Sequence, residues 1–364
     1  MTSFDVTSMP MVTGRLQAST SVTTDPETGS AGVLLEATGL TRHFRIGGPF
    51  SGRFLHAVDD MDLTIRQNEI VALVGESGSG KSTVARLLAM LYRPTAGSIA
   101  YRGRPLGSMR SRREILSYHG RVPMVLQDPY SSLSPVYRIS HGLERAFKLH
   151  QPELSSEQRQ EEAERLLSSV GLTPPSEVLH KYPYELSGGQ RQRVGFAQAL
   201  ACRPELILAD EPVSMLDVSI RIGLLNLMAE LRRRERVSVL YITHDIASAR
   251  YVADRLLVMY AGHLVESGPA EDVLRHPKHP YTQLLLSAVP DPRAPIALTG
   301  RAEVGEPPRV VDPRPGCRFR FRCPYAIDEC SRVTPRLRLL RQAHTAACHV
   351  ATSDLDMPEQ EGLP

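Results

Sequence analysis

The segment GESGSGKS, at residues 75–82, limits the possible folds of this chain more than any other stretch of it. It matches the pattern G-x-x-x-x-G-K-[ST] and lies between an apolar run at 70–74 and an apolar-periodic segment at 82–91 that precedes Pro94. These flanks predict a buried strand before the glycines and a helix after them. Glycines let a backbone wrap a phosphate with its N–H groups turned inward, and the start of a helix adds positive potential. The segment therefore predicts a phosphate-binding loop in an α/β protein.

The side chains of this loop predict what it binds. In such a loop Lys81 reaches the β- and γ-phosphates of a nucleotide, and the hydroxyl of Ser82 is a ligand of Mg²⁺. A chance glycine turn before a helix is the alternative, and the strand and helix patterns on either side argue against it. We expect ATP and Mg²⁺ to be held by these residues of the loop: Gly75, Ser77, Gly78, Gly80, Lys81, Ser82 and Thr83.

Two more apolar runs lead into titratable residues. The run 206–209 precedes Asp210 and Glu211, and the run 238–243 precedes His244. Strands that alternate with helices predict a mainly parallel sheet with its active groups at the carboxyl ends of the strands. There Asp210 can hold Mg²⁺ through water, and Glu211 can polarise an attacking water, which distinguishes a hydrolase from a nucleotide binder. Taken alone, this acidic pair is better interpreted as a polar strand exit; after a phosphate-binding loop, catalysis is the better interpretation.

The composition excludes several classes of protein. With 364 residues, 41% of them hydrophobic and 23% charged, the chain suits one large α/β domain with an appendage. Its net charge of +3 gives no indication of a nucleic-acid partner. No apolar run approaches the ~18–20 residues of a membrane span, and the first residues do not resemble a secretion signal. We therefore expect a soluble, cytoplasmic protein.

Further motifs resemble those of the ATPase subunits of ABC transporters. Residues 186–190, LSGGQ, followed by RQR, resemble the signature sequence of that family. Gln127 in VLQDP resembles the family's Q-loop, Asp217 in SMLD its D-loop, and His244 its switch histidine. With the phosphate-binding loop, the resemblance covers about residues 34–290. It implies an α/β fold with a RecA-like P-loop ATPase core, an antiparallel β-subdomain and an inserted helical subdomain.

The signature provides a second place for an anion. Ser187 and the N–H groups of Gly188 and Gly189 precede a predicted helix at 191–200, and Gln190 completes the motif. One chain needs only one phosphate cradle for one nucleotide. The resemblance implies that two subunits pack head-to-tail, each signature closing on the nucleotide held by the other. ATP would then join the dimer, and hydrolysis would release it.

The resemblance also assigns roles to single residues. His244 would contact the γ-phosphate, Asp217 would position elements of the partner, and Gln127 would bind the metal and link it to the helical subdomain. Phe44, in TRHF, lies where the family stacks an aromatic ring on adenine. An ordinary core residue of the β-subdomain is the alternative for Phe44. The expected catalytic residues are Lys81, Gln127, Glu211 and His244.

Changes of composition along the chain predict its domains. The first residues are rich in Ser, Thr and Gly, and after Pro290 prolines and arginines cluster before four late cysteines. Ser155 and Gln158 have the spacing of a capping box, and Gly171 marks the end of the same helix. We expect a flexible tail at 1–33, an ATPase domain at 34–290 with a helical subdomain at about 128–190, a cysteine-rich extension at 291–350 and an acidic tail at 351–364.

Four of the five cysteines lie close together: Cys317, Cys323, Cys330 and Cys348. Their spacing matches neither zinc ribbons nor ferredoxins, but so many thiols in a short cytoplasmic segment favour a metal over disulfides. The segments HPKHPYT and LLLSA, and the residues around the first two of these cysteines, resemble the C-terminal region of oligopeptide/dipeptide importer ATPases. That resemblance implies a cysteine-bound [4Fe–4S] cluster; structural zinc and metal-free thiols are the alternatives.

The arginines between 301 and 341 have two interpretations. They could face anionic lipid or an acidic partner, or they could form a solvated basic surface. The solvated surface is the favoured interpretation.

Together the motifs predict the ATP-hydrolysing subunit of a peptide-type ABC importer at the cytoplasmic face of the cell membrane. The resemblance implies a second ATPase subunit, two membrane-spanning permease subunits and, indirectly, an extracytoplasmic solute-binding protein as partners, with no nucleic acid. The alternatives are the ATPase of an exporter, and a soluble ABC ATPase that acts on nucleic acid or the ribosome. The extension argues against the first, and the lack of tandem ATPase halves or a long coiled-coil insertion argues against the second.

Overall fold

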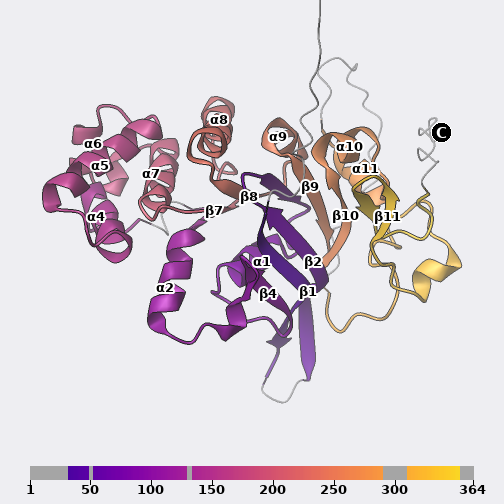
Figure 1. Cartoon of the computed structure of the whole chain (residues 1–364). Coiled ribbons are helices and arrows are strands. Elements are labelled where there is room, and N and C mark those ends of the chain that lie inside the picture. The colour runs from indigo at the N-terminus through magenta and orange to yellow at the C-terminus, as the bar shows by residue number, and fades with distance from the viewer. Residues whose placement is uncertain (1–31, 49–51, 129–132, 290–309, 353–364) are drawn as a thin grey trace, which may run out of the picture. The chain divides into compact units, whose positions relative to one another are not determined.

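Figure 1 shows the computed structural model of the chain, which describes residues 32–48, 52–128, 133–289 and 310–352. Of the tail predicted at 1–33, residues 1–31 lie outside the described residues, and Val33 is in a strand and not in a tail; of the acidic tail predicted at 351–364, residues 353–364 lie outside them.

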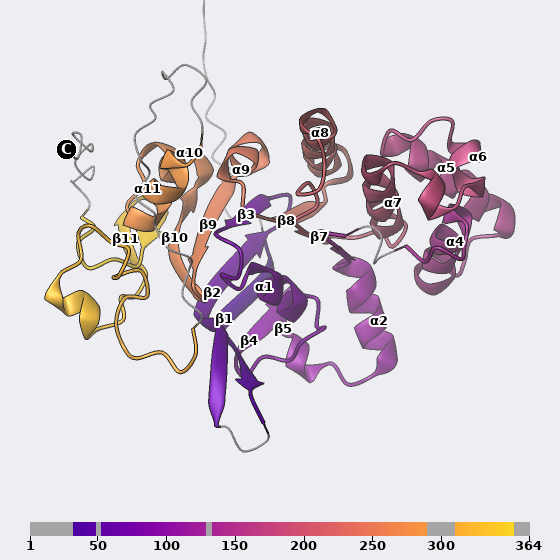
Figure 2. The ribbon, with the colours of Figure 1, turned by 180° about the vertical axis from the view of Figure 1, so that it is seen from behind.

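An eight-stranded sheet carries the strands predicted around the phosphate-binding loop (Figures 1 and 2). Five of its strands are parallel neighbours, in the spatial order β9 (Arg255–Tyr260), β3 (Ile70–Val74), β8 (Ser238–Thr243), β7 (Leu206–Asp210) and β6 (Met124–Val125). Beyond β9 the sheet continues with antiparallel strands, in the order β10 (His263–Pro269), β12 (His344–Ala346) and β11 (Arg338–Arg341).

A second sheet is antiparallel and forms the predicted β-subdomain. Its strands lie in the order β2 (Arg53–Arg66), β1 (Val33–Ile46), β4 (Ala96–Tyr101) and β5 (Arg104–Pro105). Helix α1 (Lys81–Leu88) shares a buried apolar cluster with this sheet and with one face of the eight-stranded sheet. The helix was predicted to reach Leu91, but Met90 adopts a left-handed conformation (φ 57°) and ends it earlier.

The remaining helices cover the sheets or lie beside them. They are α2 (Arg112–Arg121), α4 (Ile139–His150), α5 (Ser156–Ser169), α6 (Pro175–His180), α7 (Gly188–Leu200), α8 (Val218–Glu235), α9 (Ile246–Val252), α10 (Ala270–Arg275) and α11 (Pro280–Ser287), with short 3₁₀ turns at Leu106–Ser108, Pro183–Glu185 and Asp328–Ser331. Helices α4 to α7 form a helical subdomain that lies apart from the sheets in Figures 1 and 2 and ends at Leu200, past the predicted end near residue 190. The predicted capping box of Ser155 and Gln158 begins α5.

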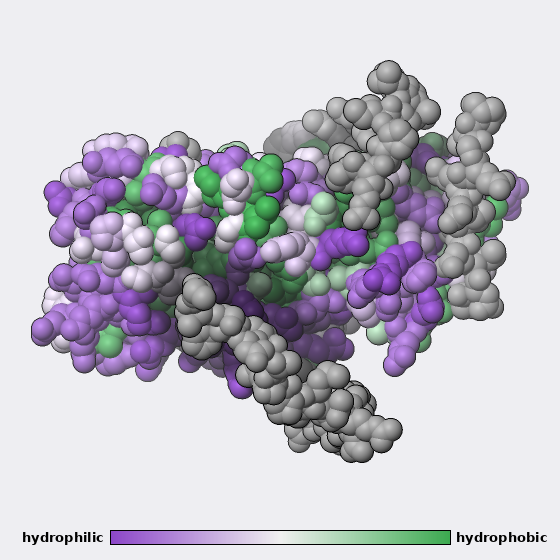
Figure 3. All heavy atoms as spheres, turned by 90° about the horizontal axis from the view of Figure 1, so that it is seen from above, coloured by the Kyte–Doolittle hydropathy of each residue, from purple (hydrophilic) through white to green (hydrophobic). Residues whose placement is uncertain are grey.

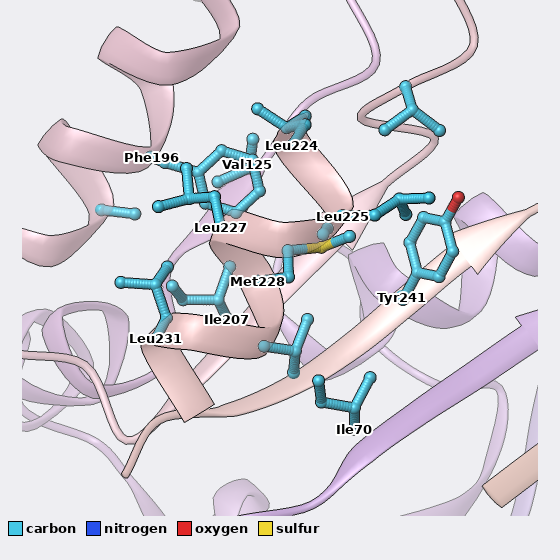
Figure 4. Packing of buried hydrophobic residues seen from close by; sticks show 14 of the residues in the cluster. Ile70, Val125, Phe196, Ile207, Leu224, Leu225, Leu227, Met228, Leu231 and Tyr241 are labelled. Carbon is cyan, nitrogen blue, oxygen red and sulfur yellow. The ribbon is translucent and has the colours of Figure 1, made fainter. Parts of the chain in front are cut away.

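Alternation along the strands explains how one sheet supports two cores. Successive side chains of a strand point to opposite faces. In β3, Ile70, Ala72 and Val74 therefore join one buried cluster, and Val71 and Leu73 join the other. Figure 4 shows the first cluster, where side chains of α8 pack over strands β7 and β8. Apolar side chains on both faces of β3 thus fix the strand that leads into the phosphate-binding loop.

The C-terminal extension shares the sheet and core of the ATPase domain. Strand β12 pairs with β10 through Glu266 and Ala346, and Phe319 belongs to the same buried cluster as the strands of the ATPase domain. The predicted boundary near 290 falls at the edge of residues 290–309, which lie outside the described residues. Within the described part of the chain, none of the helices has the length and apolar character that a bilayer crossing needs.

Candidate nucleotide-binding and catalytic site

The phosphate-binding loop begins where β3 ends and leads into α1. Two of its glycines are required by close backbone neighbours. A Cβ on Gly75 would lie 2.1 Å from the carbonyl oxygen of Met259, and one on Gly80 (φ 108°) would lie 2.0 Å from that of Ala57. Neither place has room for a side chain, so the glycines follow from the packing of the loop against β9 and β2.

Lys81, the first residue of α1, turns its side chain back into the loop. Its Nζ donates hydrogen bonds to the carbonyl oxygens of Gly75 and Glu76, each at 2.8 Å. Burial lowers the pKa of Lys81, and nearby carboxylates, chiefly that of Glu211, oppose this shift. The loop therefore carries a buried ammonium group held by its own carbonyl groups, which suits the binding of a phosphate chain.

Ser82 and Asp210 meet across the ends of α1 and β7. The hydroxyl of Ser82 donates to Oδ1 of Asp210 at 2.9 Å. Burial raises the pKa of Asp210, and the hydrogen bond from Ser82 opposes the rise. Two hard oxygen atoms beside a phosphate-binding loop are the ligands that Mg²⁺ prefers, so the pair fits the predicted metal site.

Glu211 contacts two of the other predicted catalytic residues, Gln127 and His244. Its Oε2 accepts a hydrogen bond from Nε2 of Gln127 at 3.2 Å and lies 3.3 Å from Nδ1 of His244. Its backbone is in the left-handed region (φ 47°), and its N–H donates to the carbonyl oxygen of Ile242 at 3.0 Å. Such a conformation is costly for a residue with a side chain and persists only where neighbouring contacts hold it. Two side chains, one after β6 and one after β8, thus meet at a carboxylate oxygen of the residue that follows β7.

The signature residues lie at the start of α7. The hydroxyl of Ser187 accepts the N–H of Gln190 at 3.2 Å, and the side chain of Gln190 accepts the N–H of Ser187 at 2.9 Å. The helix begins at Gly188, three residues before the predicted start, because this capping box satisfies its first donors. A Cβ on Gly189 would lie 2.4 Å from Cγ2 of Ile220, so α7 approaches α8 closely here. Among the described residues, no hydrogen bond or ion pair joins this motif to the phosphate-binding loop.

Asp217 and Phe44 have local partners. Asp217 is the N-cap of α8, and its Oδ1 accepts the N–H of Ile220 at 2.9 Å. The half-buried ring of Phe44, on β1, meets the ring of Tyr92 edge-on with centroids 5.5 Å apart, and the guanidinium of Arg42 lies 4.6 Å from its centroid. Both residues are thus held in place by neighbours of their own chain.

Sequence reasoning missed the contacts between the extension and the phosphate-binding loop. Arg322 donates to both carboxylate oxygens of Glu76, at 2.7 and 2.8 Å, and Arg318 donates to Asp59 on β2. The side chains of Arg318 and Arg322 are only 8% and 11% exposed, so a solvated basic surface is wrong for these two arginines. The N–H of Glu76 also donates to the hydroxyl of Tyr281 at 2.8 Å. The one available signal was that two of the cysteines, at 317 and 323, enclose both arginines.

The four late cysteines are neighbours in the extension. The N–H of Cys317 donates to the carbonyl oxygen of Cys330 at 2.8 Å. Burial, with a smaller contribution from the three other thiols of the group, raises the pKa of the Cys317 thiol to about 11. Backbone N–H groups hydrogen-bond to the sulfur atoms of Cys317, Cys323 and Cys348, an arrangement that stabilises thiolates.

Two known families match parts of the chain. The family described as ABC transporter matches residues 58–214, and the family described as oligopeptide/dipeptide transporter, C-terminal region, matches residues 265–330. The first span contains the phosphate-binding loop, the signature and Glu211. The second contains three of the late cysteines and both buried arginines.

Relatives match the chain over most of their own length. A Bacillus subtilis (strain 168) protein named for oligopeptide transport, the ATP-binding protein YkfD, is 40% identical over 320 residues, which are 87% of this chain and 95% of the relative. The di/tripeptide transport ATP-binding protein DppF of Pseudomonas aeruginosa is 40% identical over 326 residues, covering 87% and 98% of the two chains.

The solved structures include similar folds. The ATP-binding cassette MJ0796, solved as a dimer in a post-hydrolysis state with ADP and Pi, matches with a TM-score of 0.58 and 26% identity. The match covers 65% of this chain and 99% of the cassette.

Proposed function

This chain belongs to the ATP-binding subunits of ABC transporters, and from that membership we propose that it hydrolyses ATP to power the import of a peptide-class solute. One observation carries the proposal: an ATPase site is followed in the same chain by a region matching the C-terminal region of oligopeptide/dipeptide transporters. The names of relatives such as DppF support the same solute class. That region also favours an importer over an exporter or a soluble ABC ATPase.

The contacts of Gln127 and His244 with Glu211 support the roles proposed for the site residues in ATP hydrolysis. Lys81 would neutralise charge on the β- and γ-phosphates, and Ser82 and Asp210 would hold Mg²⁺. Glu211, held next to His244, would orient the attacking water while the histidine contacts the γ-phosphate. Catalysis would thus consist of positioning and of electrostatic stabilisation of the developing charge.

The separate position of the signature supports a head-to-tail ATPase dimer. Ser187 and the N–H groups that follow it have no partner in the phosphate-binding loop of the same chain within the described residues, so a second ATPase subunit would supply the nucleotide that they contact. The face that bears α8 and α9 shows apolar patches among hydrophilic ones in Figure 3. Near Asp217 the exposed apolar side chains include Met215 and Val218, 66% and 69% exposed. Such side chains suit an interface.

Membrane subunits complete the proposed assembly. Two permease subunits would span the membrane, the chain would bind their cytoplasmic side, and an extracytoplasmic solute-binding protein would deliver the solute. Gln127, which contacts Glu211 and precedes the helical subdomain, would pass the state of the nucleotide site to that subdomain. Phe44 would stack on adenine after Arg42 moves from its ring face.

The cysteine group supports a metal centre. Cys317, Cys323, Cys330 and Cys348 would hold a [4Fe–4S] cluster, which would act as a structural link in the extension. The N–H groups that hydrogen-bond to three of the sulfur atoms fit thiolate ligands of such a cluster, and tetrahedral zinc with Zn–S bonds of about 2.3 Å is the alternative.

Uptake by cells tests the transport proposal. Cells that lack this chain, complemented with the wild type or with Glu211→Gln, would be given labelled dipeptides and tripeptides. We expect uptake to return with the wild type and not with the variant. Equal uptake with and without the wild-type chain would contradict the proposal.

Metal analysis tests the cysteine proposal. Anaerobically purified protein should contain about four irons and four sulfides per chain and should lose them in Cys317→Ser and Cys330→Ser. Cys202→Ser, which changes the cysteine outside the group, serves as the control and should keep them. Stoichiometric zinc, or no metal at all, would contradict the cluster.

A further inference from the structure

The turn between Cys317 and Cys323 contacts the nucleotide site directly, and we call residues 317–323 the arginine turn. The guanidinium of Arg322 donates to both carboxylate oxygens of Glu76, the second residue of the phosphate-binding loop. Bidentate arginine–carboxylate pairs fix geometry as well as adding energy, because two parallel hydrogen bonds define one orientation. The arginine turn therefore orients the side chain of a loop residue from 246 positions away in the sequence.

Aromatic rings hold Arg322 in this position. Its guanidinium lies 5.6 Å from the ring centroid of Tyr260 and 5.8 Å from that of Phe319, and it also donates to the Tyr260 hydroxyl at 3.3 Å. Phe319 is buried in the main core. A guanidinium that lies among aromatic rings and donates hydrogen bonds from both terminal nitrogens has little freedom to move away from the carboxylate it pairs with.

The backbone of Glu76 is held as well as its side chain. Its N–H donates to the buried hydroxyl of Tyr281, and its carbonyl oxygen accepts from Nζ of Lys81. Tyr281 lies on α11, which follows the ATPase domain's last strand β10. Helix α11 thus holds the backbone, and the arginine turn the side chain, of one residue in the loop that must bind phosphate.

A second arginine of the same turn holds the neighbouring strand. Arg318 donates to the carboxylate of Asp59 on β2 and to the carbonyl oxygen of Ala261. Asp59 also accepts from His43 and His56, which lie beside Phe44 and Ala57 in β1 and β2. Both walls of the predicted nucleotide site, the phosphate-binding loop and the strands next to it, are therefore linked to the arginine turn.

We propose that the arginine turn clamps the nucleotide site, with Arg322 as a positioning residue that keeps the phosphate-binding loop in its nucleotide-binding shape. ATP affinity then depends on the folded state of the cysteine-rich extension. Because coupling between two sites is reciprocal, bound nucleotide in turn stabilises the turn. The inference rests on ATP binding by this loop and is independent of the transported solute and of what the cysteines hold.

Nucleotide affinity tests the clamp. The dissociation constant for ATP with Mg²⁺ would be measured for full-length wild type, Arg322→Ala, Glu76→Ala and the double variant. We expect each single change to weaken binding about tenfold, within the 5- to 150-fold range of typical couplings, and the double variant to be no weaker than either. The rate at saturating ATP should fall less than the affinity does, because within the described part of the chain Arg322 forms no hydrogen bond or ion pair with Glu211, the residue that would orient water.

Two further variants separate positioning from general damage. Arg332→Ala removes an exposed arginine of the same extension, 74% exposed and paired with Asp328, and should bind ATP as the wild type does. Arg322→Lys keeps the charge but loses the bidentate hydrogen bonding, so its affinity for ATP should lie between those of the wild type and Arg322→Ala. Wild-type affinity in Arg322→Ala, or equal losses in Arg332→Ala, would overturn the clamp. A wild-type chain that binds no ATP would overturn the proposed function itself.

Hydrogen exchange tests whether bound nucleotide stabilises the arginine turn. The same measurement shows whether a variant has folded poorly. A non-hydrolysable ATP analogue should slow amide exchange in the peptide containing residues 317–323 several-fold in the wild type. The protection should disappear in Arg322→Ala and remain in Arg332→Ala. Equal exchange with and without the analogue in the wild type would also overturn the clamp.

Discussion

Replacing His279 by asparagine should make the protein less sensitive to acid. His279 is buried at the N-cap of α11, where its Nδ1 accepts the N–H of Tyr281 at 3.0 Å. Burial lowers its pKa from 6.5 to about 3, so the ring is neutral in the folded chain at every pH above about 3. Protonation would remove the acceptor of the cap and place an unpaired charge in the interior.

The magnitude follows from the two pKa values. Between pH 6.5 and 3 the unfolded chain binds a proton on this residue that the folded chain does not, so the free energy of unfolding falls as the pH falls. The slope is at most about 1.4 kcal/mol per pH unit, which makes the loss about 2 kcal/mol at pH 5 relative to pH 7.5. Asparagine has no titrating proton and is among the best N-cap residues, so it keeps the cap and removes this loss.

Denaturant unfolding of wild type and His279→Asn at pH 7.5 and pH 5 measures the effect. Other histidines titrate in both proteins, so the quantity of interest is the difference between the two pH-dependent losses. We expect the wild type to lose about 2 kcal/mol more than the variant. Parallel losses in the two proteins would show that His279 is not the neutral cap described above.

Further changes test the loop and the extension. Gly80→Ala should abolish detectable ATP binding, because its Cβ would lie 2.0 Å from the carbonyl oxygen of Ala57; calorimetry with ATP checks this, and unchanged affinity would refute the close packing. Glu266→Ala should lower the free energy of unfolding by about 3–5 kcal/mol, since the fully buried carboxylate accepts from His344 and from two backbone N–H groups. If the denaturant midpoint shifted by no more than it does for an ordinary surface substitution, this role would be contradicted.

Local patterns were sufficient to predict the strand, loop and helix around Lys81. Its apolar run, its glycines and its helix period are all contained within a short segment, and the structure confirms their arrangement. Helix ends were less predictable. The early end of α1 at Leu88 depends on the left-handed backbone of Met90, and the early start of α7 depends on the capping box at Ser187. Neither feature changes the spacing of the apolar residues, and that spacing was the signal from which the helix ends were predicted.

The contacts of the extension could not be predicted, because they join distant segments. Nothing local to Arg322 says that a carboxylate of the phosphate-binding loop lies opposite it, and a run of arginines is most often solvated. Glu76 and the arginine turn meet in a fold in which the extension also adds β12 to the sheet beside β10. The assigned roles of Gln127, Glu211 and His244 stay predictions, although the structure gathers these side chains at one carboxylate.

ATP turnover by the purified chain tests the central claim most directly. Wild type, Glu211→Gln and Glu271→Gln would be compared at saturating ATP and Mg²⁺, the last variant changing an exposed glutamate of α10. The account predicts that Glu211→Gln lowers the turnover rate at least about 100-fold while ATP affinity stays within a few-fold, because the carboxylate orients water and does not hold the nucleotide. Glu271→Gln should match the wild type. Turnover by Glu211→Gln at the wild-type rate would contradict the account.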